Sequence, residues 1–445
     1  MDSIIDPIGI ERVVVINDDA TEQGGAAAIA LLSTKLLNAR HIPVTFLSGS
    51  ADIDPELEGS GAEIGVLGGR HILDGPRGTA AVRGLFDPTI QTRLAQWIAV
   101  RDTPGTVYHL HNWHKVLSPS VFGALRRVAH RLVISAHDYF LACPNGGYFI
   151  YPQHTACELV PGSWRCIATA CDRRHYAHKL WRVARHWTRQ RMLDLNGSGA
   201  IVLAVHQAMV PLLARAGIDE SRIRVLRNPV VPWRRARVIA EQNRHVFFIG
   251  RLDGDKGADL LARAARQAGA PLRIVGDGPL AASIARDNPD ADLLGWRTRD
   301  QIASLIASAR MVVSPTRSRE TFGLVPLEAL MSGVPVVLSG SFPTSDELSR
   351  RDLAVVCDPL DERTLAVAIA KLLHDDRRVR GMSLRGFTEA RTFAPTPAQW
   401  CDKLVTLYRR RLDDASVGRS SAADWPPPGD LAASATASSA GPIQC

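Results

Sequence analysis

Two cations follow the first predicted strand in the second half of the chain. The run reads Gly250-Arg251-Leu252, then three residues, then Lys256-Gly257. Arginine and lysine bind phosphate oxygens, and parallel sheets bind ligands at the carboxyl ends of their strands. We therefore expect Arg251 and Lys256, the latter at the start of a helix, to form a clamp for a diphosphate.

Two glutamates lie eight residues apart farther along, in the run Glu320-Thr-Phe-Gly323-Leu-Val-Pro-Leu-Glu328. A helix is predicted from Phe322 to Met331, so Glu320 precedes it and Glu328 lies within it. Each carboxylate can accept two or more hydrogen bonds, which suits the hydroxyls of a sugar or a ribose. We expect both carboxylates to face one ligand at the N-terminal end of this helix.

Glycine turns follow several predicted strands. Gly24-Gly25 opens a helix after the first strand, where free backbone N–H groups favour an anion. A Gly-Asp-Gly-Pro run from Gly276 to Pro279 makes a tight turn after another strand. The first pair lacks the G-x-G-x-x-G spacing of a dinucleotide site. Taken alone, it fits an ordinary strand–helix turn as well as an anion site.

In their order and spacing, these runs resemble the retaining glycosyltransferases of family 4, which have the two-domain GT-B fold. The resemblance extends over nearly the whole chain before the tail, and it includes His137-Asp138 and Asn228-Pro229. It implies an α/β fold with two Rossmann-like, doubly wound domains facing a central cleft. It also implies transfer of a sugar from a UDP-, GDP- or ADP-sugar donor, with no cofactor required for catalysis.

The resemblance implies a role for each matching residue. Arg251 and Lys256 would hold the leaving diphosphate, whereas Glu320 would bind the transferred sugar and Glu328 the ribose. The other donor-binding positions that it implies are Gly24, Gly25, Asn228, Gly250, Asp277, Gly278, Leu294, Phe322, Gly323, Leu324 and Val325.

Histidines end two predicted strands of the first half. The resemblance implies that His137 reaches the donor sugar or the reaction centre. Asp138 would bind substrate, orient His137 or cap the next turn. His111 and His114 follow another strand, where an acceptor-side role and a structural role fit equally well.

Four of the seven cysteines, Cys143, Cys157, Cys166 and Cys171, lie in an insertion at about 143–195. Their spacing, C-x13-C-x8-C-x4-C, contains no C-x2-C pair of the kind that marks many zinc sites. Three interpretations stay open for them: a structural zinc site, reduced buried thiols, or disulfides.

The same insertion contains ten basic or histidine residues between positions 173 and 191. An apolar stripe lies opposite an arginine stripe on the predicted helix: Leu180, Val183 and Trp187 against Arg182, Arg185 and Arg189. Such a helix suits an anionic membrane surface that carries a lipid-linked acceptor. Equally, the apolar stripe could pack on its own domain and leave the arginines in solvent.

Strands and helices alternate in both halves. The first half has strand-like runs at 12–16, 43–47, 106–110, 132–135 and 200–204, and helix-like runs at 26–38, 90–100, 118–129 and 207–216. The second half has strand-like runs at 245–249, 272–275, 292–294, 311–314, 335–338 and 354–357, and helix-like runs at 256–267, 299–309, 322–331 and 363–374. This alternation predicts two parallel, doubly wound sheets.

We therefore predict an N-terminal acceptor-binding domain over residues 1–230 and a nucleotide-sugar-binding domain over 244–396. A linker at 231–243 joins them. A basic helix at 397–414 would cross back to the first domain. The Ala-, Ser- and Pro-rich composition of the tail at 415–445 predicts disorder.

Composition and charge narrow the function. A 46% hydrophobic content excludes wholesale disorder, and no run reaches the ~18 apolar residues of a membrane span. The N-terminus carries acids where a secretory signal carries Lys or Arg, so we expect a cytoplasmic protein, peripheral at the inner membrane face at most. The net charge of +8 fits phosphorylated ligands or anionic membranes. Nucleic acid is disfavoured because no helix-turn-helix, zinc-finger or RNP-type signature is present.

The sequence thus predicts a glycosyltransferase of bacterial exopolysaccharide or surface-polysaccharide assembly, acting on a glycan or polyprenyl-linked acceptor. Two alternatives share the fold: a nucleotide-sugar epimerase or hydrolase, and a sugar-nucleotide-binding protein without activity. The combination of E-x7-E with GRLxxxKG favours the transferase over the epimerase. The presence of Arg251, Lys256, Glu320 and Glu328 disfavours an inactive binder.

Overall fold

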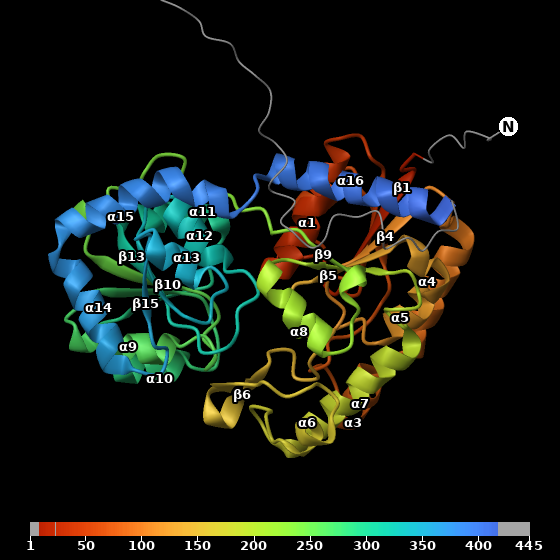
Figure 1. The fold of residues 1–445 in the computed structure, drawn as a ribbon, viewed down its shortest axis with the longest axis horizontal. Helices are drawn as coiled ribbons and strands as arrows, with labels where there is room; N and C mark the ends of the chain where they lie inside the picture. The colour runs from red at the N-terminus through yellow and green to blue at the C-terminus, as the bar shows by residue number, and fades with distance from the viewer. Residues whose placement is uncertain (1–8, 23, 417–445) are drawn as a thin grey trace, which may run out of the picture.

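The computed structural model describes residues 9–22 and 24–416 of the 445-residue chain. Two α/β domains lie side by side, the first coloured red to yellow-green and the second green to blue (Figure 1). Each domain is built on one wholly parallel sheet. The predicted fold class is therefore confirmed.

The first sheet has the strand order β3-β2-β1-β4-β5-β8-β9. Its strands are β1 (Arg12–Asn17), β2 (Val44–Ser48), β3 (Glu63–Val66), β4 (Thr106–Leu110), β5 (Leu132–Ala136), β8 (Ile201–Ala204) and β9 (Ile223–Val225). Its helices are α1 (Gly25–Asn38), α2 (Pro55–Glu58), α3 (Arg77–Leu85), α4 (Pro88–Arg101), α5 (Ser120–Leu125) and α8 (Val210–Arg215). The central strands are buried along their length, as continuous β-branched runs covered on both faces must be. The sequence did not predict β3 and β9.

The second sheet has the order β12-β11-β10-β13-β14-β15. Its strands are β10 (His245–Ile249), β11 (Leu272–Val275), β12 (Asp292–Gly295), β13 (Ala309–Ser314), β14 (Val336–Ser339) and β15 (Ala354–Cys357). Its helices are α9 (Ala258–Gln267), α10 (Ala281–Asp287), α11 (Arg299–Leu305), α12 (Leu324–Met331), α13 (Ser345–Arg350), α14 (Glu362–His374) and α15 (Asp376–Glu389). The strand order reverses beside the first strand of each sheet, at β1/β4 and at β10/β13, which is where sheets of this kind bind ligands.

In the second domain, two predicted helix starts are wrong by two residues. α9 begins at Ala258 and not at Lys256, because Gly257 precedes it in the left-handed conformation with φ 74°. A Cβ atom on Gly257 would lie only 2.2 Å from the carbonyl oxygen of Pro315 at the end of β13. Glycine is therefore required here for both conformation and space. α12 likewise begins at Leu324, after a left-handed glycine.

The insertion between β5 and β8 carries little regular structure. Its elements are β6 (Phe149–Ile150), β7 (Thr155–Ala156), α6 (Trp164–Ala168) and the long helix α7 (Tyr176–Met192). α6 and α7 lie at the lower edge of the first domain in Figure 1. The segment 231–243 is mostly irregular and packs on the second domain, where the amides of Trp233 and Val238 donate to Ser332.

Helix α7 buries Arg185 and Arg189 together with Val183, and it exposes the other two residues of its apolar stripe. Arg185 and Arg189 donate to backbone carbonyls at 2.7 and 2.8 Å, and the Arg185 guanidinium lies 5.3 Å from the ring centroid of Trp113. Leu180 and Trp187 are 43% and 46% exposed. Both orientations considered for this helix are therefore wrong with respect to Arg185 and Arg189, because each of these guanidinium groups is buried and donates to a carbonyl of the first domain.

Helix α16 (Pro397–Ser416) lies on the first domain although it follows the second in sequence (Figure 1). Its apolar side chains, among them Trp400 and Leu404, are buried with residues of β1 and α1. The hydroxyl of Tyr408 forms a 2.6 Å hydrogen bond with Nδ1 of His109 in β4. Of the tail predicted to be disordered, residues 415 and 416 belong to α16 and the rest lie outside the described residues. None of the described helices is long and apolar enough to span a membrane.

Tyr408→Phe should lower the free energy of unfolding by about 1–3 kcal/mol, because it leaves the buried Nδ1 of His109 without its partner. Chemical denaturation measures the loss. Tyr176→Phe is a matched control, since its hydroxyl donates to the carbonyl of Ile167 at an exposed position. The control should cost clearly less, and equal losses would show that the bond to His109 adds nothing to stability.

Candidate functional site

The carboxyl ends of β4 and β5 bring four ionisable side chains together. His111 Nδ1 lies 2.9 Å from His137 Nε2, within hydrogen-bond distance, and the two rings stack at 5.2 Å. His114 Nδ1 lies 3.4 Å from Asp138 Oδ2. His111 is buried and the other three are partly covered. His111 and His114 therefore adjoin the histidine that the family resemblance places at the reaction centre.

A buried aspartate at the end of β1 positions this cluster. Asp18 is fully buried and accepts hydrogen bonds from the amides of Lys115, Val116 and Leu117 at 2.8–2.9 Å. These bonds fix the loop that follows His111 and His114. Our sequence analysis missed Asp18, although an Asn-Asp-Asp run directly after an apolar strand was a usable signal.

Burial shifts the pKa of both His137 and Asp138. It lowers the pKa of His137 to about 4 and raises the pKa of Asp138 to about 6. Burial also lowers the pKa of His111 and His114 well below the usual value. At neutral pH the histidines are therefore uncharged and serve as hydrogen-bonding groups.

On the second domain, the two expected clamp cations lie at the end of β10 and just before α9, and each is already paired with a carboxylate. Lys256 forms an ion pair with Glu320, and Thr316 Oγ1 donates to the same Glu320 oxygen at 3.2 Å. Arg251 forms an ion pair with Asp253 and its side chain is 64% exposed. Glu320 precedes α12, as predicted, so its carboxylate and Lys256 lie near the N-terminal end of that helix.

Glu328 lies inside α12 and pairs with an arginine that our sequence analysis missed. Arg299, the first residue of α11, donates to Glu328 Oε1 at 2.5 Å and also to the carbonyl of Val231. Burial raises the pKa of Glu328, although Arg299 acts in the opposite direction. The spacing gave no signal for Arg299, because 29 residues separate the two partners.

The turns after β10, β11 and β12 form one edge. The Leu252 amide donates to the carbonyl of Asp277 at 2.9 Å, and Asp277 Oδ2 accepts from the Trp296 amide at 2.8 Å. A Cβ atom on Gly276 would lie 1.9 Å from the Gly250 carbonyl oxygen, so the first two turns touch through their backbones. The predicted donor positions Gly250, Asp277, Gly278 and Leu294 all lie in these turns or at the strand end beside them.

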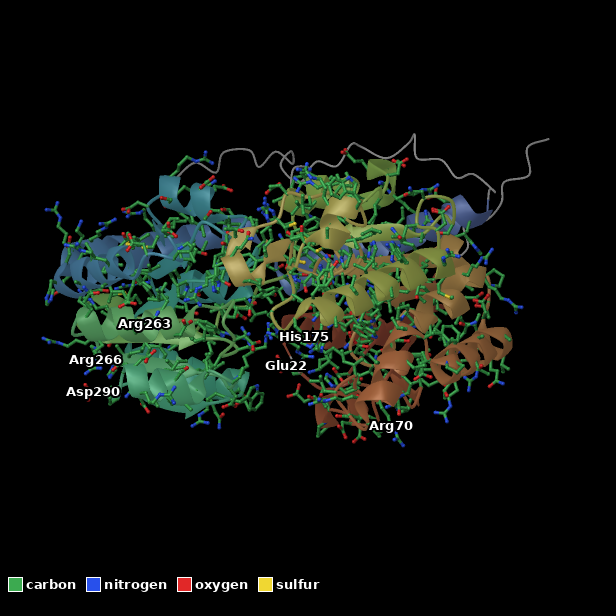
Figure 2. All side chains as sticks on the ribbon, turned by 90° about the horizontal axis from the view of Figure 1, so that it is seen from below. Glu22, Arg70, His175, Arg263, Arg266 and Asp290 are labelled. Atoms are coloured by element: carbon green, nitrogen blue, oxygen red, sulfur yellow. The ribbon has the colours of Figure 1, made fainter. Side chains whose placement is uncertain are left out.

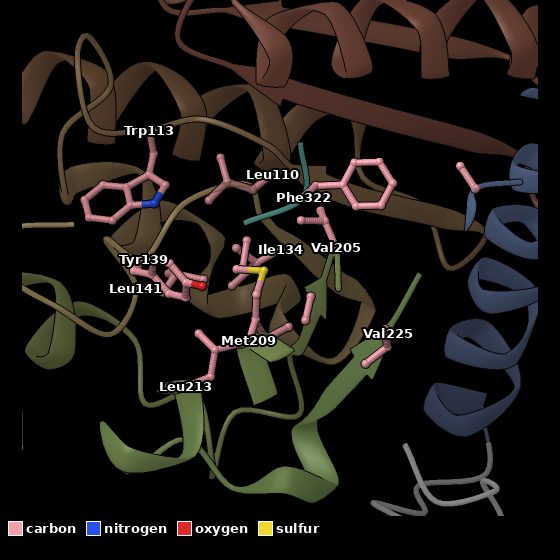
Figure 3. Packing of buried hydrophobic residues seen from close by; sticks show 14 of the residues in the cluster. Leu110, Trp113, Ile134, Tyr139, Leu141, Val205, Met209, Leu213, Val225 and Phe322 are labelled. Carbon is pink, nitrogen blue, oxygen red and sulfur yellow. The ribbon is translucent and has the colours of Figure 1, made fainter. Parts of the chain in front are cut away.

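Contacts between the domains bring the two sets of residues together. Thr321 Oγ1 donates to the carbonyl of His137 at 2.9 Å. A Cβ atom on Gly25 would lie 3.1 Å from Leu324 Cδ1, so the N-terminal ends of α1 and α12 approach each other. Phe322 is 2% exposed and packs beside residues of the first domain such as Val205 (Figure 3).

Predicted site residues from both domains therefore meet at the domain boundary. They are Gly24, Gly25, His137, Asp138, Lys256, Glu320, Phe322, Gly323, Leu324 and Val325. Figure 2 shows Glu22, which precedes α1, and His175 of the insertion at this boundary.

Asn228 lies beside the segment that leads from the second domain to α16. It is buried close to the point where the chain returns from the second domain: the side chain of Arg227 donates to the carbonyl of Phe393, and the Val230 amide donates to that of Pro395. None of the contacts found among the described residues joins Asn228 to the group at the domain boundary.

The four cysteines of the insertion are buried free thiols. As the described side chains stand, they include no group of three or more His, Cys, Asp or Glu that is arranged to hold a metal ion.

Solved structures share this arrangement of two domains. Anabaena Alr3699/HepE in complex with UDP and glucose has a TM-score of 0.61 at 16% identity, covering 92% of this chain and 100% of that one. WaaG, a glycosyltransferase involved in lipopolysaccharide biosynthesis, has a TM-score of 0.62 at 14% identity, covering 89% and 99%. The likeness includes both domains and their junction, so the fold is GT-B.

Residues 243–375 match the family model described as "Glycosyl transferases group 1". This part of the chain is therefore similar in sequence to glycosyltransferases of that group. A GDP-mannose-dependent alpha-mannosyltransferase of Corynebacterium glutamicum is 32% identical over 133 residues, which is 30% of this chain and 32% of that protein. The protein of the same description from Mycobacterium tuberculosis is 30% identical over 237 residues, 52% of this chain and 60% of that protein. These matches span less than two thirds of the length of the curated relatives.

The stability of this GT-B protein should fall between about pH 7.5 and pH 5.5. Burial lowers the pKa of His109 and His186 to about 3 and that of His137 to about 4. Below the ordinary value of 6.5 only the unfolded chain takes up these protons, so each histidine costs about 1.4 kcal/mol at pH 5.5. The raised pKa of Asp138 acts in the opposite direction but by less. Urea midpoints at the two pH values test this, and a flat profile would contradict the burial of neutral histidines.

Proposed function

We propose that this chain is a retaining glycosyltransferase of family 4, which transfers a sugar from a nucleotide-diphosphate sugar to a hydroxyl of a glycan or polyprenyl-linked acceptor. The observation that carries the proposal is the Lys256–Glu320 ion pair near the N-terminal end of α12, where Leu324 meets Gly25 of α1. The N-terminal ends of α1 and α12 approach each other, and helix N-termini and lysine side chains both favour a multiply charged anion. The adjoining carboxylate favours a ligand that also carries hydroxyls.

Donor binding would exchange the partners of these charges. The diphosphate would take Arg251 from Asp253 and Lys256 from Glu320. Glu320 would then accept hydrogen bonds from the hydroxyls of the transferred sugar, and Glu328, held by Arg299, would accept from the ribose. The cations neutralise the leaving diphosphate, a task that a divalent metal ion performs in other sites.

The transfer would break the bond between the anomeric carbon and the diphosphate oxygen and form one to the acceptor oxygen on the same face. The acceptor proton would pass to the departing diphosphate. Neutral His137 would contribute a hydrogen bond near the reaction centre, and His111 Nδ1 would fix its ring through Nε2.

The relatives give two candidate bases for the donor. The mannosyltransferases are named as GDP-mannose-dependent, whereas one structural neighbour is described in complex with UDP and glucose. The neighbour involved in lipopolysaccharide biosynthesis supports a role in surface-polysaccharide assembly.

Lys256→Ala and Glu320→Gln should each lower kcat/KM at least about 100-fold, because each removes an interaction worth about 3 kcal/mol in the transition state. Release of nucleoside diphosphate is measured with UDP-, GDP- and ADP-sugars, with and without membrane lipid extract. Lys371→Ala, an exposed lysine of α14 in the same domain, is the matched control and should act like the unmodified chain.

Three results would contradict the proposed residue roles or the transferase activity. Normal turnover in Lys256→Ala or Glu320→Gln would show that the substituted residue is not needed for catalysis. Equal release with and without acceptor would indicate a hydrolase or an epimerase. Binding of a nucleotide sugar without release under either condition would indicate an inactive binder.

We further propose that the insertion meets an anionic membrane where the lipid-linked acceptor lies. Trp164 is 77% exposed and Trp187 46%, and Gly162 lies against Trp187, which brings α6 close to α7. The guanidinium of Arg165 lies 5.9 Å from the Trp164 ring. Exposed tryptophans beside arginine suit the interface of an anionic bilayer.

The double variant Trp164→Ser/Trp187→Ser should lose flotation with liposomes that contain anionic lipid. It removes the amphipathic rings that enter the interface and keeps the net charge. Trp296→Ser, which removes a 59% exposed tryptophan from the second domain, is the control and should float normally. Flotation that is equal with neutral liposomes, or absent in the unmodified chain, would refute the membrane partner.

A further inference from the structure

Four cysteine side chains of the insertion line one small enclosed cavity. Cys143, Cys157, Cys166 and Cys171 surround a space of about 10 Å³, together with Lys179 of α7. That is room for one sphere the size of a water molecule. All four are buried and none forms a disulfide.

A buried lysine charge points at these sulfurs. Lys179 is 1% exposed, and its Nζ lies 3.3 Å from Cys171 Sγ and 3.4 Å from Cys166 Sγ. A buried ammonium ion is costly unless an opposite charge compensates it. The nearby carboxylate of Asp172 already pairs with Arg182 at 2.7 Å. The sulfurs are therefore the groups that must carry the negative charge.

The thiols do not supply that charge by themselves. An ordinary cysteine thiol has a pKa of about 8.5 and is mostly protonated at neutral pH. A divalent metal ion changes this, because it deprotonates the thiols that ligate it. Four thiolates around one Zn²⁺ carry a net charge of −2, which the ammonium of Lys179 would partly neutralise.

The segment that carries the thiols has too little regular structure to be stabilised by helices and strands alone. From Cys143 to His175 it contains two strands of two residues, one 3-10 turn and the five-residue helix α6. Segments with so little regular structure are usually held by disulfides or a structural metal ion. The backbone already gathers the cysteines: the Cys157 amide donates to the Tyr148 carbonyl at 2.7 Å, and Asn145 Nδ2 donates to the Cys171 carbonyl at 2.9 Å.

We propose that Cys143, Cys157, Cys166 and Cys171 ligate one zinc ion in this cavity, with Lys179 donating N–H···S hydrogen bonds to the thiolates. Binding replaces the four thiol protons with four Zn–S bonds and releases the protons to solvent. The sulfurs as they stand do not form a ready metal site. Bonds of about 2.3 Å require the thiols to turn inward about their Cα–Cβ bonds, with the ammonium outside the sulfur shell.

Such a site would couple to the domain boundary. Glu158, next to Cys157, forms ion pairs with Arg319 of the second domain and with Arg215 of α8. Arg173, two residues after Cys171, lies 3.5 Å from Asp253, the partner of Arg251. The zinc ion would hold the segment in which Glu158 and Arg173 contact the second domain, beside Glu320 and Arg251 respectively.

The test is metal analysis of the full chain, purified without chelators from zinc-supplemented medium. We expect about one zinc per chain. A mercurial reagent should release it in step with modification of the four thiols, and cobalt substitution should give the intense bands of a tetrahedral thiolate site. These measurements on the unmodified chain do not depend on whether a variant folds.

Variants then assign the ligands. Cys166→Ser and Cys171→Ser should reduce zinc to background, whereas Cys357→Ser and Cys401→Ser, which alter buried thiols of other cores, should retain it. Lys179→Leu should weaken zinc retention against a chelator by about 10–100-fold, as loss of an outer hydrogen-bond partner does. Background zinc with four free thiols in the unmodified chain, a disulfide within the four, or iron with inorganic sulfide would each overturn the zinc assignment.

Discussion

A hydrogen bond between the domains, from Thr321 Oγ1 to the carbonyl of His137, joins the two halves of the candidate site. The bond connects the residue after Glu320 to the residue that follows β5. Each sheet presents its ligand-binding edge at the carboxyl ends of its strands, so a contact at this place holds the two edges together. Phe322, the next residue, is buried among first-domain side chains and excludes water from the contact. Lys256 lies in the second domain and His137 in the first, so both could act on one substrate only when the domains are arranged in this way.

The charges at the boundary are arranged as exchangeable pairs. Lys256, Arg251 and Arg299 each form an ion pair with a carboxylate of the same domain. A diphosphate can replace the carboxylates because it offers more oxygens to the same cations. The carboxylates that it releases then become acceptors for hydroxyls. Binding of the donor's diphosphate would in this way free the carboxylates that then bind its sugar. This sequence of events involves only ion pairs within the second domain.

The parts of the structure that the sequence predicted are those set by local chemistry. The β-branched runs became the central strands because burial on both faces requires them, and Gly257 and Gly276 mark turns that no Cβ atom could enter. The edge strands β3 and β9 were missed because they are short and carry polar residues. Pairs such as Arg299–Glu328 and His111–His137 join residues 29 and 26 positions apart, and no spacing rule connects them. The E-x7-E and GRLxxxKG motifs could be recognised because all the residues of each motif lie close together in the sequence.

Helix α7 shows why an amphipathic pattern does not by itself say which face is buried. The burial of an arginine depends on whether carbonyl groups and aromatic rings are available at the right positions, and those come from α3, the loop after β4 and the loop after β5. Once Arg185 and Arg189 are satisfied there, Leu180 and Trp187 must face outward. Lys179 then points inward as well, into the thiol cavity. The orientation of one helix thus places a cation beside four sulfurs and two apolar side chains on the surface. The proposed membrane would contact the exposed face of α7, and the proposed zinc ion would lie beside Lys179 on its buried face.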